Sequence, residues 1–307
     1  MTITPPVNKR FVAIGEAMVE MAPSAVPGDY RMGFAGDTLN TAWYARRALP
    51  GGWQVDYLTA LGEDAVSDRM VDFMEAARIG TAHISRLKGR TIGLYLIELK
   101  DGERSFAYWR GQSAARLLAE DAGRLTRGLA GAGIVYLSGI TLAILEGSGR
   151  ELLYAALRSA RAAGAQVVFD PNLRPRLWPD TDTMCHAVME TAALSDVVLP
   201  SHEDEAAYFG DADVAATAER YGAAGAGLVV VKNGGGEMLT LSAGAFATHA
   251  PEVVAQVVDT TAAGDSFNAG FLAEWLEGGD VAASVRAGAK LAAYVIGQRG
   301  ALCEAAG

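Results

Sequence analysis

The stretch that decides the fold reads Asp259-Thr-Thr-Ala-Ala-Gly-Asp-Ser-Phe-Asn-Ala-Gly270. Residues 253–258 before it are apolar and rich in valine, and residues 267–276 after it follow an apolar helical pattern, so we predict that a strand passes into a helix here. A helix N-terminus carries unpaired N–H groups and partial positive charge, and small residues let an anion approach that backbone closely. Asp265 alone would most simply be a helix cap. The small residues around it and the second carboxylate, Asp259, favour phosphate chemistry instead.

The composition indicates a large α/β domain. The chain has 307 residues, of which 50% are hydrophobic and 20% charged, enough for one large core. A net charge of -10 without a basic block argues against nucleic acid or an anionic membrane as partner, and it means that local Arg or Lys must meet any anionic substrate. The first ten residues lack a signal-peptide core, and Cys185 and Cys303 have no metal-ligand spacing. We therefore expect a cytoplasmic protein with reduced thiols.

One uncharged segment, 128–145, is long enough to span a bilayer. Its glycines and Ser138 interrupt the hydropathy. We therefore predict the end of a helix, a buried strand at 134–137 and a loop in place of a membrane span.

From that strand onward, short apolar runs alternate with helical patterns. The expected strands are 134–137, 166–170, 197–199 and 228–232, and the expected helices are 149–163, 181–194, 203–209, 215–224, 264–276 and 281–298. Valine-rich strands alternating with helices are typical of a mostly parallel sheet covered on both faces. Residues 238–241 and 245–249 form an expected hairpin after the last parallel strand.

The N-terminal third adds a second, smaller sheet. Segments 91–99 and 104–110 read as strands, and Asp-Gly between such runs is a strong hairpin signal. We expect this hairpin to join the region 14–31 in a sheet that does not alternate with helices. Tyr108 and Arg110 share one face by strand periodicity, and Tyr95 on the partner strand can join them. An isolated arginine here would be a surface residue, whereas two tyrosines and an arginine suit a polar, acidic ligand.

The run from Asp259 to Asp265 resembles the C-terminal signature of the ribokinase-like, phosphofructokinase-B type sugar kinases, and the resemblance extends from Ile14 to about Ala301. It implies a single ribokinase-like domain over residues 1–307: a three-layer αβα fold with a mostly parallel sheet, and a small β-sheet lid from about 14–33 and 91–111. It also implies ATP and Mg2+ as cofactors, and a homo-oligomer formed through the lid sheet.

The same resemblance assigns the chemistry of the C-terminal signature. Asp265 takes the place of the base that accepts the proton of the attacking hydroxyl, and the backbone of Ala262, Ala263 and Gly264 takes the place of the anion hole. Asp259 is either a loop-holding residue, part of a cation shell, or an ordinary turn residue at a strand end.

Two groups of residues are implied for the sugar. Gly33, Gly36 and Asn40 match the N-terminal sugar-binding signature, although a glycine turn and helix cap would look similar. The run from Gly93 to Arg110 resembles the ketodeoxygluconate kinases of the family, in which Tyr and Arg side chains bind a keto acid. Tyr95, Tyr108, Arg110 and Arg174 are therefore expected at the substrate, which the resemblance implies is 2-keto-3-deoxy-D-gluconate. The alternatives are fructose, ribose, or a non-catalytic sugar sensor on the same fold.

The nucleotide site is implied by residues that follow strands. These are Asn172, Ser201, Lys232, Gly234 and, at the phosphates, Gly264. The family has Asn-x-x-Glu where this chain has Ser201-x-x-Asp204, so either Asp204 or Glu205 is expected to order Mg2+ through water. An acidic first turn of a helix is the plain alternative for these carboxylates.

Overall fold

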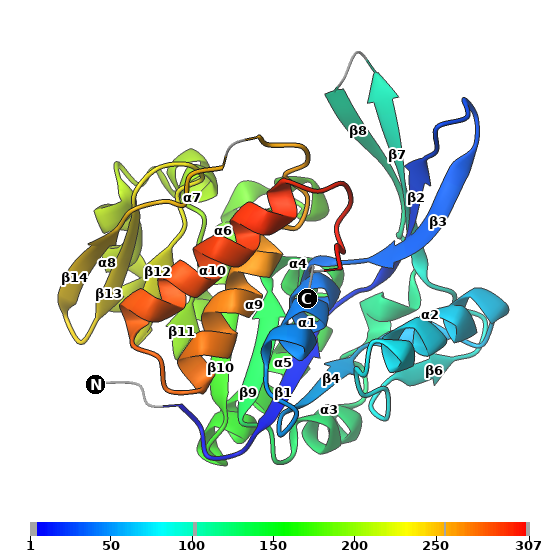
Figure 1. The fold of residues 1–307 in the computed structure, drawn as a ribbon. Helices are drawn as coiled ribbons and strands as arrows, with labels where there is room; N and C mark the ends of the chain where they lie inside the picture. The colour runs from blue at the N-terminus through cyan, green and yellow to red at the C-terminus, as the bar shows by residue number, and fades with distance from the viewer. Residues whose placement is uncertain (1–4, 101–102, 255, 305–307) are drawn as a thin grey trace.

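The computed structural model describes residues 5–100, 103–254 and 256–304. A mixed, mostly parallel sheet forms the centre of the molecule (Figure 1), in the order β14-β13-β12-β11-β10-β9-β1-β4. Its parallel strands are β1 Arg10–Ile14, β4 Gln54–Leu58, β9 Ile134–Ser138, β10 Gln166–Asp170, β11 Val197–Val198 and β12 Leu228–Val231. The antiparallel pair β13 Met238–Ser242 and β14 Ala245–His249 closes one edge.

The parallel strands are apolar at successive positions because helices cover both faces of the sheet. In β1, Phe11 and Ala13 belong to one core cluster, whereas Val12 and Ile14 belong to the other. The first cluster packs under α1 Asp37–Ala48, α2 Ala65–Ala76, α9 Ala263–Leu276 and α10 Val281–Ile296. The second packs under α3 Ala122–Leu129, α4 Gly139–Ile144, α5 Gly147–Ala162, α6 Thr181–Ala193 and α8 Val214–Ala223. The helix α7 His202–Phe209 follows β11.

The strand order places the site. The chain leaves β1 for β4 on one side and later returns to β9 on the other, so the strand order reverses around β1. Ligands of open α/β sheets bind beyond the carboxyl ends of the strands at such a point. The segments that follow β1, β9, β10 and β12 therefore meet at one edge of the sheet.

The predicted hairpin is confirmed, and it lies in a separate four-stranded sheet with the order β3-β2-β7-β8. Its strands are β2 Met18–Pro23, β3 Tyr30–Ala35, β7 Gly93–Lys100 and β8 Glu103–Trp109. The turn at Asp101 and Gly102 lies outside the described residues. This small sheet stands away from the central sheet (Figure 1), and one of its faces packs on the C-terminal segment through Tyr95, Ile97 and Ala301.

Two predictions from the sequence are wrong. The described residues of 253–258 form no strand: Val253 is 94% exposed, and the N–H groups of Val258 and Asp259 donate to the carbonyl of Ile296 at the end of α10. With the helix end as their hydrogen-bond partner, these residues join no sheet. The loop expected after β9 contains α4, which begins at a capping box of Ser138 and Thr141 that a reading by hydropathy alone passes over.

The helix end expected in segment 128–145 is that of α3, although its start was not predicted, and the two-stranded sheet of β5 Ala60–Gly62 and β6 Ser85–Leu87 was not predicted. Within the described part of the chain, no helix is long and apolar enough to cross a bilayer.

Candidate functional site: a carboxylate cluster at a helix N-terminus

The loop before α9 presents backbone N–H groups rather than a side-chain cap. Ala262, the residue before the helix, adopts a left-handed conformation with φ 61°, and no side chain caps the first turn. The N–H of Ala263 donates to the carbonyl of Thr260 inside the turn, 3.2 Å away. Among the described residues, the N–H groups of Ala262 and Gly264 have no such partner. An anion bound here would meet these two N–H groups and the positive end of α9.

Three carboxylates from different elements lie around this helix N-terminus. Asp265 Oδ2 accepts a hydrogen bond of 2.8 Å from Asn40 Nδ2 in α1. Asp37 Oδ2, at the start of α1, accepts one of 2.7 Å from Asn172 Nδ2. Asn172 follows β10 with φ 35°, a conformation in which asparagine is enriched.

The third carboxylate, Asp170, ends β10 and holds the cation of the cluster. Its Oδ2 accepts 2.9 Å from Lys232 Nζ, which follows β12, and 2.6 Å from Asn268 Nδ2 in α9. Lys232 Nζ also donates to Asn268 Oδ1, 3.1 Å away. A Cβ built on Gly264 would lie 3.5 Å from Lys232 Nζ, so the ammonium group lies directly beside the open turn.

Burial and neighbouring charge raise the pKa of two carboxylates, Asp265 and Asp37. Burial, then the charge of Asp37, raises the pKa of Asp265 to about 8, while the hydrogen bond from Asn40 and the charge of Lys232 act in the opposite direction. Burial also raises the pKa of Asp37. At neutral pH, Asp265 therefore carries a proton for most of the time, and above pH 8 it is a stronger base than an ordinary aspartate.

The small sheet brings the predicted aromatic side chains together. Tyr95 and Tyr108 face each other in the β7–β8 register, with ring centroids 5.9 Å apart. Tyr95 is buried, and its hydroxyl donates to Glu20 Oε2. Tyr108 is 53% exposed. Gly33, on β3, pairs with Glu20 of β2, the strand that lies next to β7.

Arg110 is not a surface residue. It follows β8, its side chain is only 11% exposed, and it forms an ion pair with Glu16, which follows β1. Gly36 lies against the same loop, because a Cβ there would come 2.3 Å from the backbone oxygen of Glu16. The small sheet, the start of α1 and the end of β1 thus meet at one point.

The residues expected at the nucleotide line up along the ends of β10, β11 and β12. Ser201 and Lys232 form an isolated parallel bridge, and Gly234 follows with φ 53°. Arg174 Nη1 lies 3.5 Å from Asp204 Oδ2, and both side chains are partly exposed. The charges of Asp170 and Lys232 also act on the pKa of Asp204, so this pair lies at the border of the cluster.

Glu205 is directed elsewhere. It is 1% exposed, and its Oε2 accepts hydrogen bonds from Arg220 and Tyr221 in α8. Burial raises its pKa to about 7. The helical spacing could not separate Asp204 from Glu205, whereas the structure places only Asp204 beside Arg174. Among the described residues, no group of three or more His, Cys, Asp or Glu side chains is arranged to hold a metal ion.

Sequence reasoning did not assign four participants. These are Glu16, Asp37, Asp170 and Asn268. The first three follow or end strands, or begin a helix, at the carboxyl edge of the sheet, which is a usable signal. Asn268 lies three residues after Asp265, so both point to one side of α9.

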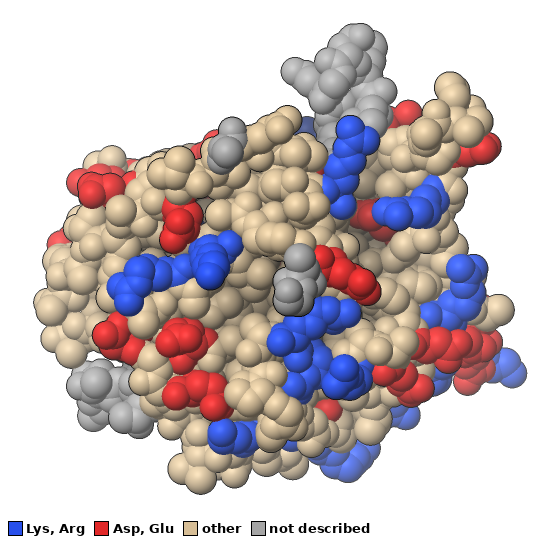
Figure 2. All heavy atoms as spheres, in the orientation of Figure 1, with Lys and Arg blue, Asp and Glu red and all other residues tan. Residues whose placement is uncertain are grey.

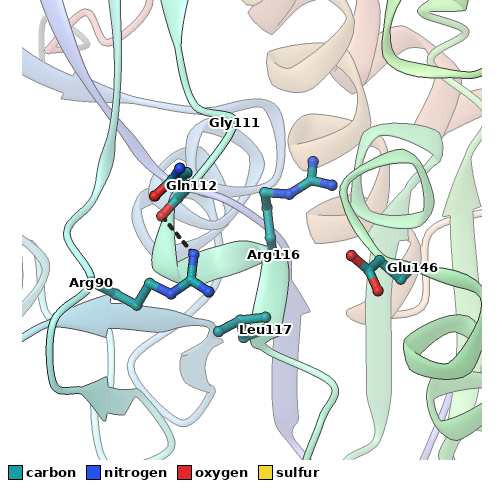
Figure 3. A pocket seen from close by; sticks show the side chains of 6 residues that line it. All are labelled: Arg90, Gly111, Gln112, Arg116, Leu117 and Glu146. Carbon is teal, nitrogen blue, oxygen red and sulfur yellow. Dashed lines mark hydrogen bonds between the residues drawn. The ribbon is translucent and has the colours of Figure 1, made fainter.

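A separate hollow of about 340 Å³ lies at the base of the small sheet (Figure 3), lined by Arg90, Gly111, Gln112, Arg116, Leu117 and Glu146. Arg90 Nη1 donates to the carbonyl of Gln112 across 3.3 Å. The face in Figure 2 carries acidic and basic side chains in separate small groups. Neither feature includes the carboxylate cluster.

Comparisons with known proteins agree with this geometry. The 2-dehydro-3-deoxygluconokinase of Escherichia coli (strain K12) is 39% identical over 302 residues, covering 96% of this chain and 97% of that protein. The protein of the same name from Haemophilus influenzae is 35% identical over 302 residues, covering 96% of each chain. A fructokinase with bound ATP from Xylella fastidiosa superimposes with a TM-score of 0.84 at 27% identity, over 96% of this chain and 94% of that one.

These likenesses confirm the ribokinase-like α/β fold that the sequence predicts. A family model described as pfkB family carbohydrate kinase matches residues 8–304, nearly the whole chain. With the carboxylate cluster at the N-terminus of α9, this places the chain among sugar kinases rather than among other proteins with doubly wound sheets. The chain belongs to the pfkB family of carbohydrate kinases.

Proposed function

We propose that this protein is an ATP-dependent kinase that phosphorylates the primary hydroxyl of 2-keto-3-deoxy-D-gluconate, giving 2-keto-3-deoxy-6-phosphogluconate. The observation that carries the proposal is Asp265, a carboxylate with a pKa of about 8 beside the free N–H groups of an uncapped helix. Four relatives that are 35–39% identical bear the name of this activity, which supports the choice of substrate.

Asp265 acts as the base. An alcohol loses its proton as it attacks the γ-phosphorus, and a carboxylate within hydrogen-bond reach accepts that proton. Asn40 holds Oδ2 of Asp265 from one side, which leaves Oδ1 for the sugar hydroxyl. The transfer is a direct in-line displacement without a phosphorylated side chain.

The turn before α9 and Lys232 stabilise the charge that moves with the phosphoryl group. The N–H groups of Ala262 and Gly264 point into the turn, and the Ala263 N–H shapes it through Thr260. Lys232 Nζ lies next to Gly264 and shields the phosphate from Asp170. Preformed donors of this kind act where charge develops and need little reorganisation.

A magnesium ion fits this site only through water and phosphate oxygens. Mg2+ keeps several waters and usually takes one or two carboxylates with the substrate phosphates. Asp204, partly exposed and placed beside Arg174, is the carboxylate that would hold such a hydrated ion, and the ion would neutralise the phosphates. Glu205 is committed to Arg220 and Tyr221, so we assign it no role in metal binding.

The small sheet serves as the lid. Tyr95 and Ile97 pack on Ala301 and against Ala262, so the lid face lies over the catalytic turn. Closure there excludes water, which otherwise competes as the phosphoryl acceptor. We propose that Gly33, Gly36 and Asn40 bind the sugar chain and that Arg110 binds the carboxylate of the keto acid. Arg174 meets either a carboxylate or a phosphate, with Asn172, Ser201 and Gly234 on the nucleotide side.

The test is ADP release with Mg-ATP against ketodeoxygluconate, ketodeoxygalactonate, fructose and ribose, measured side by side. A clear preference for the keto acids supports the assignment. Preference for a neutral sugar keeps the base and removes the carboxylate role of Arg110; the resemblance to fructokinases gives this outcome its weight. No turnover with any of them favours a non-catalytic sugar sensor.

We further propose a cytoplasmic homo-oligomer in which lid sheets pair. The strand β8 is an edge of the small sheet, and its Phe106 and Trp109 are 43% and 61% exposed. Exposed edge strands with apolar side chains favour pairing with another chain. Light scattering of the wild type and of a Trp109→Lys variant tests this: the variant should shift toward monomer, and a monomeric wild type would contradict the proposal.

A further inference from the structure

We infer that Glu16 is a positioning residue that determines selectivity for a carboxylate substrate by orienting Arg110. The inference rests on the proposed function and goes beyond it, because Glu16 itself touches neither the phosphoryl group nor the base. Glu16 lies just after β1 and is 2% exposed. It is thus a buried charge, and a buried charge needs a partner.

The side chain of Glu16 has two partners, one at each oxygen. Oε2 accepts from Arg110 Nη2, and Oε1 accepts from Ser113 Oγ. The pair connects the segment after β1 with the segment that follows β8. Both oxygens are held, so the carboxylate cannot rotate freely and the guanidinium is fixed with it.

The guanidinium is only partly used. Among the described residues, Arg110 Nε is buried and has no hydrogen-bond partner. A buried donor left unpaired is unfavourable by about 1–3 kcal/mol. Because Nε is enclosed, a ligand oxygen reaches it only if the small sheet moves on binding, and a carboxylate would then satisfy it with a charge-assisted bond.

The backbone of Gly93 packs closely against both side chains of the Glu16–Arg110 pair. A Cβ built on Gly93 would lie 2.9 Å from Glu16 Oε1 and 3.2 Å from Arg110 Cβ, so a larger residue at 93 would push the pair apart. At Gly36 a Cβ would come 2.3 Å from the backbone oxygen of Glu16. The proposed sugar-binding turn and the lid are therefore both built against Glu16.

A second buried ion pair in the same molecule serves as a matched control. Arg10 and Asp56 have side-chain exposures of 13% and 3%, against 11% and 0% for Arg110 and Glu16. Each nitrogen of the Arg10 guanidinium has a partner: Nε binds Asp56, Nη1 binds the carbonyl of Ala130 and Nη2 that of Gly128. No nitrogen of this pair is without a partner, in contrast to Arg110 Nε, so we assign the pair a role in stability alone.

The experiment compares Glu16→Ala, Glu16→Gln and Asp56→Ala by keto-acid binding without ATP, by KM and kcat, and by Tm. Losing the orientation of Arg110 should raise Kd and KM for the keto acid roughly 10- to 100-fold in Glu16→Ala, with kcat changed by less than about threefold. Glu16→Gln keeps one acceptor oxygen for Arg110, and its amide N–H can donate to Ser113 Oγ, so it should recover most of the affinity. Asp56→Ala should lower Tm at least as much and leave KM unchanged.

A double-mutant cycle with Arg110→Ala separates positioning from general damage. In the Arg110→Ala background, Glu16→Ala should raise Kd no further, because the residue through which it acts is gone. Additive losses, or an equal rise of KM in Asp56→Ala, would overturn the inference. If the wild type binds no keto acid, the proposed function fails instead, and the two failures are distinguishable by that single measurement.

Discussion

The amino and carboxyl ends of the strands in the central sheet differ in how their charged side chains are paired. At the amino end of β1, the three guanidinium nitrogens of Arg10 donate hydrogen bonds to Asp56 and to two backbone carbonyls. At the carboxyl ends, Asp37, Asp170 and Asp265 crowd together with Lys232 as the cation between them, and two of the three carboxylates have raised pKa values. The charges at the amino end are matched, whereas at the carboxyl ends three carboxylates face one lysine, and we propose that a cation and anionic substrates complete that arrangement. Unfavourable charge in the free protein thus marks the working edge.

The sharpest way to test this contrast is Asp265→Asn, which removes the proposed base and one of the crowded charges. Turnover should fall about 10³-fold or more. The folded chain keeps the Asp265 proton up to about pH 8, while the unfolded chain releases it near the ordinary value of 3.8, so this group makes the fold less stable as pH rises between these values. Asn cannot ionise, so Tm at pH 8.5 should rise by roughly 2–4 °C. Retained turnover, or a lower Tm at pH 8.5, would contradict the assignment.

At the opposite edge, Arg10→Ala should do the reverse. It leaves Asp56 buried with Gln54 as its remaining side-chain partner, and breaking a buried pair in this way typically costs about 3–5 kcal/mol. We expect a large fall in Tm with unchanged turnover per folded molecule, read from thermal unfolding and initial rates. The control is Lys9→Ala, which removes an exposed pair with Glu277 and should change Tm little.

Lys232→Met removes the cation from the working edge. Asp170 loses its ammonium partner, and the pKa of Asp265 rises further because the lysine charge lowers it. The rate at pH 7.5 should fall roughly 10- to 100-fold, and the pH profile should shift to higher pH. Lys290→Met, on the exposed side of α10, is the control and should leave the profile in place. An unshifted profile in Lys232→Met would show that the lysine does not act on the base.

The smallest expected effect needs no mutation. Because Asp265 must be ionised to act, kcat/KM should fall about tenfold between pH 9 and pH 7, following the pKa of about 8 in the free enzyme. Asp204→Asn should keep this acidic limb, since Asp204 is not the base. A flat profile over this range would mean that Asp265 is already ionised at neutral pH.

Much of the fold could be predicted because buried parallel strands appear in the sequence as short valine-rich runs between helical patterns. From β10 onward, those strands and helices match the expected ranges to within two residues. The failure at 253–258 has a physical cause: β-propensity describes a half-buried pleated surface, whereas Val253, Val257 and Val258 are exposed and the Val258 N–H bonds the end of α10.

The resemblance to sugar kinases, and not a local pattern, assigned Asp265, Asn40 and Lys232 to the expected site. The structure brings them together: Asn40 binds Asp265, and Lys232 Nζ lies beside Gly264. Glu16 meets Arg110 across 94 positions, and Lys232 meets Asp170 across 62, so no local pattern could reveal either pair. Asp204 and Glu205 are adjacent in the sequence, but their partners, Arg174 and Arg220, belong to other segments of the chain. A local pattern therefore could not show which partner each carboxylate has.

The small sheet carries the residues proposed for sugar recognition, and the region of the central sheet carries those proposed for phosphoryl transfer. The side chains expected to recognise the sugar are Tyr95 on β7, Tyr108 on β8 and Arg110 just after β8. The proposed base and the proposed anion-binding turn lie instead at the start of α9. Replacement of the Glu16–Arg110 pair would change the charge of the sugar pocket without moving Asp265. On the proposed function, substitutions in the small sheet could therefore change which sugar is bound while the proposed phosphoryl-transfer residues stay unchanged.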